Sequence, residues 1–253
     1  MRIRHATLVA LALISLLPGP ASWARSAMEI AVEDDAAPWS AKDGTGFAND
    51  IVTAAYAAVG TPISLKVVPY SRCKALVVNA LVPACFSMSW APELKGVVAF
   101  SQIPIFSVRS QFFQRTARPV GVEHADQLPP GTVVGVVNGY EYPDAVYRLR
   151  DEGILRFEPA NSEQINLKKL AVGRIQLALV NDNRIKPSDT LIANAGVSGQ
   201  VQYAFDAGEM PAYIGFSLQH PAGDEAKKLF DRGFSIIRAN GTLKQIEKKW
   251  KTS

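Results

Sequence analysis

The sequence predicts an α/β protein built from two lobes, and three observations support this fold class. Short apolar segments alternate with helical ones from residue 28 onward, and the alternation starts again after Pro129-Pro-Gly131. The expected strands at 84–88 and 132–137 are too apolar for a sheet with one face in water, which favours a parallel sheet covered by helices on both faces. The chain is also long enough for two lobes of about 100 residues, each with its own core.

The first 24 residues are typical of a secretory signal peptide. A basic start, Met1-Arg-Ile-Arg4, precedes the apolar run 6–17 and the small-x-small sequence Ser22-Trp-Ala24. A membrane anchor is the competing interpretation, but a spanning helix needs about 20 apolar residues and this run is much shorter. We therefore expect cleavage after about Ala24 and release into the periplasm. No cysteine lies near the cut, so no lipid anchor is expected.

The charge balance argues against a nucleic-acid partner. The chain has 27 basic and 23 acidic residues, and removal of the leader takes away Arg2 and Arg4 but no acid. The small remaining positive excess lacks the basic bias of nucleic-acid-binding domains. Hydrophobic residues make up 48% of the chain, so we expect a folded protein and not a disordered one.

Cys73 and Cys85 are the two cysteines of the chain. We expect a disulfide between them, because exported proteins meet an oxidising compartment. Antiparallel packing of a helix at 71–80 against a strand at 84–88 would bring the two side chains together. Two buried thiols are the alternative.

The expected elements divide the chain into three parts. The first part is expected to contain strands at 28–32, 64–68 and 84–88, with helices at about 49–58 and 71–80. The second part is expected to contain strands at 132–137, 155–158 and 176–180, with helices at 144–150 and about 162–172. Crossings between the parts are expected at 111–119 and near 206–211, followed by a strand at 212–218 and helices at 224–238 and 242–251.

Several short motifs occur in a characteristic order. They are Gly46-Phe-Ala-Asn-Asp-Ile51, Ala91-Pro-Glu-Leu-Lys95 with Phe100-Ser101, Gly131-Thr-Val-Val-Gly135, Leu170-Ala-Val-Gly-Arg174, and Asn240-Gly-Thr242 before a Lys-Trp ending. With these motifs the chain resembles the family-3 extracellular solute-binding proteins, the periplasmic amino-acid-type receptors of ABC importers, over nearly its whole mature length. The resemblance implies a type II periplasmic-binding-protein fold, or Venus flytrap, with two crossing strands and a ligand between the lobes.

The resemblance also implies a domain layout and a function. Lobe 1 is expected at residues 25–116 and 209–253, and lobe 2 at 117–208. The expected function is capture of a small polar solute by a monomeric, non-enzymatic protein that delivers it to an ABC permease. Hinge closure around a ligand at the carboxyl ends of the strands fits this layout.

One position departs from the family pattern. Amino-acid receptors of the family carry an arginine that clamps the ligand carboxylate in a bidentate fork, and Leu94 occupies that position here. The family acid that holds the ligand ammonium corresponds to Asp182. Arg72 is a candidate for a relocated carboxylate clamp, with an ordinary helix-surface arginine as the alternative. We therefore expect carboxylate recognition of a non-standard kind.

Further ligand-binding candidates come from loops at the expected cleft. Aromatic side chains can stack on a ligand, backbone N–H groups at a helix start can bind an anionic group, and glycine permits close approach of the backbone. The candidates are Asp35, Trp39, Tyr70, Ser87, Ser89 and Trp90 in lobe 1, and Gly139 and Tyr140 in lobe 2. Core packing or ordinary loop structure is the alternative for each.

The sequence lacks the patterns of a metal site, a phosphate-binding loop and a hydrolase nucleophile, so we expect no metal and no cofactor. An enzyme on the same scaffold, similar to cyclohexadienyl dehydratase, is the main alternative function. Its candidate acids are Glu141, Asp182 and Glu209. A receptor that reports to a sensor or an oxidoreductase is a third hypothesis.

Overall fold

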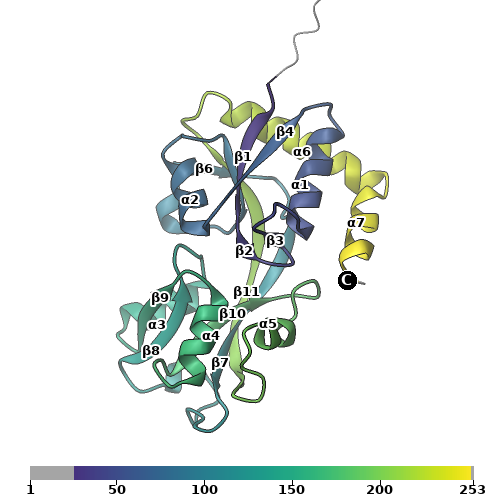
Figure 1. The fold of residues 1–253 in the computed structure, drawn as a ribbon. Helices are drawn as coiled ribbons and strands as arrows, with labels where there is room; N and C mark the ends of the chain where they lie inside the picture. Colours follow the sequence, from purple (N-terminus) through teal and green to yellow (C-terminus); the bar gives the residue numbers. More distant parts are fainter. Residues whose placement is uncertain (1–25, 252–253) are drawn as a thin grey trace, which may run out of the picture.

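Two lobes joined by two long strands make up the structure, a computed structural model that describes residues 26–251 (Figure 1). The upper lobe in Figure 1 contains both ends of the described chain, and the lower lobe contains its middle. This arrangement confirms the predicted two-lobed α/β fold. The expected signal peptide, residues 1–24, lies outside the described residues.

Lobe 1 contains a sheet in which β1 lies between two parallel neighbours. Its strands are β1 (Met28–Glu33), β4 (Ile63–Val68), β5 (Ala84–Met88) and β6 (Val98–Phe100), and a ribbon of β2 (Asp35–Ala36) and β3 (Ser40–Ala41) follows β1. Its helices are α1 (Phe47–Ala57), α2 (Tyr70–Val78), α6 (Gly223–Ala239) and α7 (Thr242–Lys251). Gly233 lets α6 meet α1, because a Cβ atom there would lie 1.9 Å from the Ala55 carbonyl oxygen.

Lobe 2 repeats the parallel arrangement on a smaller scale. Its strands are β8 (Thr132–Val137), β9 (Leu155–Ala160) and β10 (Leu177–Asp182), with β8 parallel to both neighbours. Its helices are α3 (Asp144–Asp151), α4 (Glu163–Ala171) and α5 (Ser188–Asn194). Ser162 caps α4, because its Oγ atom accepts a hydrogen bond of 3.3 Å from the Ile165 N–H group.

Two antiparallel strands connect the lobes, β7 (Phe106–Arg115) and β11 (Val201–Ser217). β11 pairs with β7 from Val201 to Ala212 and then with β5 and β6 of lobe 1. The main sheet is therefore mixed, which corrects the expectation of a parallel sheet, because the crossing strands run against their neighbours. The expected boundary at 116/117 follows the end of β7, and the boundary at 208/209 falls inside β11.

Cys73 on α2 and Cys85 on β5 form a disulfide, which confirms the predicted pairing. Their Cα atoms are 5.7 Å apart, and both residues are fully buried. The bond ties the first turn of α2 to the neighbouring strand. Closure of a loop this short contributes about 2–3 kcal/mol in the chain-entropy description.

Each lobe has its own apolar core on both faces of its part of the sheet. Ile30, Phe86 and Phe230 are fully or almost fully buried in lobe 1, and Leu167 and Leu177 in lobe 2. Between residues 26 and 251, no helix combines the length and the apolar character that a membrane span requires.

Candidate functional site

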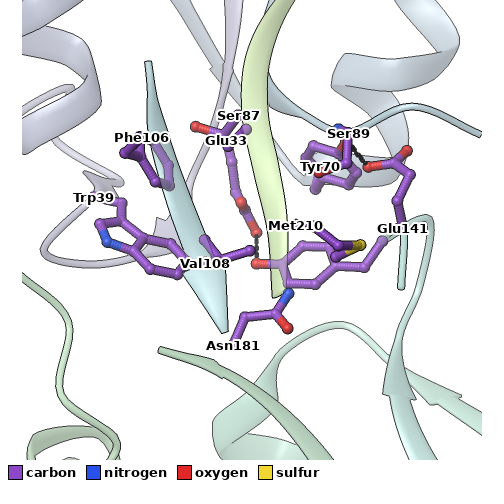
Figure 2. Close-up of a pocket in the computed structure, with 12 residues that line it drawn as sticks. Glu33, Trp39, Tyr70, Ser87, Ser89, Phe106, Val108, Glu141, Asn181 and Met210 are labelled. Atoms are coloured by element: carbon purple, nitrogen blue, oxygen red, sulfur yellow. Dashed lines mark hydrogen bonds between the residues drawn. The ribbon is translucent and has the colours of Figure 1, made fainter. Parts of the chain in front are cut away.

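A small cavity lies between the lobes, beside the crossing strands. Aromatic and apolar side chains form much of its wall, with a few polar groups among them, which is typical of small-molecule sites (Figure 2). The lining residues are Glu33, Trp39, Tyr70, Ser87 and Ser89 from lobe 1, Tyr140, Glu141 and Asn181 from lobe 2, and Phe106, Val108, Met210 and Ala212 from the crossing strands.

Glu33 is the last residue of β1 and enters the cavity from lobe 1 (Figure 2). Only 4% of the residue is exposed, and its Oε1 atom accepts a hydrogen bond of 2.5 Å from the Tyr140 hydroxyl group of lobe 2. Burial raises the pKa of the Glu33 carboxyl to about 8, although the Tyr140 hydrogen bond and the charge of Lys186 oppose the rise. Within residues 26–251, Glu33 forms no ion pair.

Glu141 extends in the opposite direction, from lobe 2 toward lobe 1. Its Oε2 atom accepts hydrogen bonds from the Tyr70 hydroxyl group at 2.5 Å and from the Ser89 backbone N–H group at 3.3 Å. Its Oε1 atom lies 2.8 Å from the Nζ atom of Lys74. Burial raises the pKa of the Glu141 carboxyl, and the charge of Lys74 opposes that rise. A protein cation thus compensates Glu141 directly.

Trp39 forms an aromatic wall that lobe 2 holds in place. Its indole N–H group donates a hydrogen bond of 2.9 Å to the Asn183 side chain, and the Nζ atom of Lys186 lies 4.4 Å from the ring centroid. Lys186 is buried and pairs with Glu163. The Phe106 ring lies 5.1 Å from that of Trp39. Together the rings offer a surface on which an apolar or cationic group can stack.

Ser87 adds a hydroxyl group to the wall of the cavity. Its φ angle is +64°, a conformation that is uncommon for residues other than glycine. Its Oγ atom is buried and has no hydrogen-bond partner in the described part of the chain. A buried hydroxyl group without a partner costs about 1–3 kcal/mol, so a polar ligand that bonded to it would remove that cost.

The structure brings five of the predicted ligand-binding residues together on the cavity wall and places the other five outside it. Those on the wall are Trp39, Tyr70, Ser87, Ser89 and Tyr140. Those outside it are Asp35 on β2, Arg72 on the exposed face of α2, Trp90, which is 53% exposed, Gly139, which packs against Ser71, and Asp182.

Asp182 and Leu94 bear on how a ligand's charges can be recognised. Asp182 receives two hydrogen bonds of 3.1 Å from Arg109, its neighbour across the β7–β10 pair. Leu94 is buried in a core cluster of lobe 1. Glu209, another candidate acid, is exposed on β11 opposite Arg109. Of the three proposed acids, only Glu141 lines the cavity.

Sequence reasoning missed seven of the twelve lining residues as ligand contacts. These are Glu33, Phe106, Val108, Glu141, Asn181, Met210 and Ala212, although Glu141 was a candidate catalytic acid. One signal was available for Glu33, because it follows an apolar run at the carboxyl end of the first strand, where open α/β sheets bind ligands.

In the part of the chain that the structure describes, the cavity is lined by acidic side chains and not by basic ones. Two carboxylates line it, and none of its described lining residues is basic. The two lysines nearby already have acidic partners, Lys74 with Glu141 and Lys186 with Glu163. Residues 26–251 contain no group of three or more side chains suited to holding a metal ion.

Comparison with known proteins agrees with this architecture. The family model described as bacterial extracellular solute-binding proteins, family 3, matches residues 28–253. The chain belongs to this family. No curated protein sequence matches it.

Several solved structures share the fold of this family-3 protein at low sequence identity. An ancestral arginine-binding protein bound to arginine is 16% identical, with a TM-score of 0.74 and coverage of 89% of this chain and 98% of that one. A histidine kinase sensor domain similar to periplasmic binding proteins is 16% identical, with a TM-score of 0.75 and coverage of 89% of this chain and 96% of that one. An ancestral amino-acid-binding protein, a precursor of cyclohexadienyl dehydratase, is 15% identical, with a TM-score of 0.68 and coverage of 88% of this chain and 94% of that one.

Proposed function

We propose that this family-3 protein is exported to the periplasm, with cleavage after about Ala24, and captures a small organic cation between its lobes. The observation that carries the proposal is Glu33. This carboxyl group is buried in the cavity, and no lysine or arginine of the described chain pairs with it. A positively charged ligand would supply the missing partner.

The rest of the cavity favours the same class of ligand. A buried carboxylate is costly unless it is paired, and an alkylammonium or guanidinium group would pair with Glu33 and lie against the rings of Trp39 and Phe106. A ligand carboxylate would instead meet Glu33 and Glu141 and no basic lining residue. The proposed ligand is therefore an amine or guanidine without an α-carboxylate clamped by arginine.

Binding of such a cation should be linked to proton release. Below pH 8 the Glu33 carboxyl is mostly protonated, because its pKa is about 8. A cation favours the ionised form, so binding displaces the proton. The affinity should rise up to about tenfold per pH unit toward pH 8 and level off above it.

A thermal-shift screen of the mature protein against amines, polyamines, amino acids, organic acids and sugars identifies the ligand class, because a ligand that binds the folded state stabilises it. Cationic compounds are expected to raise the melting temperature. Calorimetry in two buffers of different ionisation enthalpy then measures proton release, and Glu33→Gln is the matched control. This variant should lose at least tenfold in affinity at pH 8 and release no proton. Stabilisation by organic acids or sugars alone would contradict the proposal.

Delivery to an ABC permease is part of the proposed function, since the family consists of extracellular solute-binding proteins. The alternative is a receptor for a sensor, which the similarity to a histidine kinase sensor domain favours. Genes for a permease and an ATPase beside the gene for this chain would support import. Transport of the cation that depends on both genes would establish it.

A periplasmic enzyme is the second candidate function, and one observation favours it. A carboxyl with a pKa of about 8 is protonated at neutral pH, as a general acid must be, and Glu33 faces a cavity. The substrates of cyclohexadienyl dehydratase, prephenate and arogenate, are carboxylic acids, which the charge of this cavity disfavours. Turnover of either compound by the protein, with its loss in Glu33→Gln, would replace the binding proposal.

A further inference from the structure

The Glu141 carboxylate crosses from one lobe into a set of donors on the other. Glu141 lies in the segment between β8 and α3, and only 3% of its side chain is exposed. The donors all belong to lobe 1: the Tyr70 hydroxyl group, the Nζ atom of Lys74 and the Ser89 backbone N–H group. Figure 2 shows Glu141 directed toward Tyr70 and Ser89.

These donors have the composition of a carboxylate-binding site. One full positive charge and two uncharged donors meet both oxygens of one carboxylate at 2.5, 2.8 and 3.3 Å. Tyr70 and Lys74 lie on α2, which the disulfide of Cys73 fixes to β5, and Ser89 directly follows β5. The site is therefore held by rigid elements of one lobe and does not depend on lobe 2 for its shape.

The backbone before Glu141 also packs closely against α2 of lobe 1. The Gly139 carbonyl oxygen accepts a hydrogen bond of 3.3 Å from Lys74. A Cβ atom on Gly139 would lie 2.9 Å from the Cα atom of Ser71, so a glycine is needed where this segment meets α2. The φ angle of Gly139, +86°, also favours glycine.

We propose that lobe 1 carries a carboxylate-binding site, formed by Tyr70, Lys74 and Ser89, and that Glu141 fills it as an internal ligand. This contact ties the lobes together and occupies the position at which a small organic carboxylate would bind. The site sets specificity, since a carboxylate-bearing solute must displace Glu141 to use it. A monocarboxylate in solution should bind there once the Glu141 side chain is removed.

The test uses the mature protein with Glu141→Ala and sodium propionate as the probe. The variant should have a larger radius of gyration by X-ray scattering and a lower melting temperature than the wild type. Millimolar propionate should raise the melting temperature of the variant, whereas sodium chloride at equal ionic strength should not. The radius of gyration should stay larger, because free propionate fills the site without joining the lobes. The wild type should not respond, because its site is filled. Adding Lys74→Met to Glu141→Ala should abolish the response by removing the charge of the site.

Two results would overturn the inference. One is a failure of propionate to act on Glu141→Ala, and the other is an equal response of the wild type. If Glu141→Ala does not fold, Glu141→Gln provides the second measurement, because it keeps the shape and the acceptor but loses the charge. An unchanged melting temperature for Glu141→Gln would then count against the charged contact of Glu141 with Lys74 across the lobes.

The outcome is separable from that of the proposed function. Propionate binding involves the donors of lobe 1 and leaves Glu33 intact. A protein that binds no cation would still show the propionate response, and a protein that binds a cation would still lack it if the inference is wrong.

Discussion

Glu33 and Glu141 point in opposite directions across one cavity, and their surroundings differ in charge. Each is 4% exposed, and each accepts a hydrogen bond of 2.5 Å from a tyrosine of the opposite lobe. Lys74 lies 2.8 Å from Glu141, whereas Glu33 has no such partner within residues 26–251. Burial raises the pKa of Glu33 to about 8, and the Tyr140 hydrogen bond and the charge of Lys186 offset that rise only in part.

The comparison shows that burial and a tyrosine hydrogen bond do not by themselves decide what a carboxylate does. A tyrosine donor stabilises the charged form only in part, and a nearby cation supplies the rest. Glu141 therefore acts within the protein, where it joins the lobes. Glu33 keeps its capacity for a cation, which makes it the group that a ligand would satisfy.

The largest effect is expected for Glu33→Gln on the pH dependence of stability. The pKa of Glu33 in the folded protein, about 8, lies above the ordinary glutamate value of 4.5. The protonated Glu33 carboxyl therefore makes its full contribution to the free energy of unfolding below pH 4.5, and this contribution is lost as the pH rises to 8. In the wild type the free energy of unfolding should fall in this window by up to about 1.4 kcal/mol per pH unit. Urea unfolding at four pH values should show a flatter profile for Glu33→Gln, and equal slopes would contradict the assignment.

A second prediction concerns the cation that distinguishes the two sites. Lys74→Met leaves Glu141 buried without its partner and should lower the free energy of unfolding by about 3 kcal/mol at pH 8. The loss should be smaller at pH 5, where Glu141 can take up a proton. Lys66→Met is the matched control, because the pair of Lys66 with Glu29 is exposed and should be worth less than about 1 kcal/mol. Similar losses of unfolding free energy in the two variants would show that burial does not make the Lys74–Glu141 pair more important than an exposed pair.

A third prediction separates the two sites through the disulfide. Replacing Cys73 and Cys85 by alanine should lower the free energy of unfolding by about 2–3 kcal/mol. Cys73 precedes Lys74 on α2, so hydrogen exchange in α2 should become faster, while exchange in β1, which carries Glu33, should change less. Equal acceleration in both elements would mean that the disulfide stabilises the lobe as a whole and not the Glu141 site.

Local sequence patterns predicted many of the elements well. The bounds of β5 and β8 agree with the prediction, because apolar runs flanked by proline or glycine define them. The single strand β11 was predicted only in part, as a crossing near 206–211 followed by a strand at 212–218, whereas it begins at Val201. Pairing with β7 carries the chain through that segment, with irregular register near Gly208. The helix α5 was missed because it is short and weakly periodic.

The charge partners of the site could not be predicted from local patterns. Asp182 and Arg109 are 73 residues apart in sequence, and Glu141 and Tyr70 are 71 apart. Such pairs depend on strand register and on how the lobes meet, which no single segment encodes. The sequence located the ends of the elements that bear Tyr70 and Ser89, but the pairing of each carboxylate needed the three-dimensional structure.

The smallest effect is expected for Asp182, and it tests which acid recognises a cation. Asp182 is buried and accepts two hydrogen bonds from Arg109, whose side chain is 55% exposed. Because Asp182 lies outside the cavity wall, Asp182→Asn should leave the affinity for a cationic ligand within about twofold of the wild type. Loss of the partly exposed pair should lower the free energy of unfolding by about 1 kcal/mol. Calorimetry on Asp182→Asn and Glu33→Gln in parallel decides between the acids. If Asp182→Asn abolished binding while Glu33→Gln did not, the ammonium site expected from the family pattern would be correct, and Glu33 would be a buried group without a ligand-binding role.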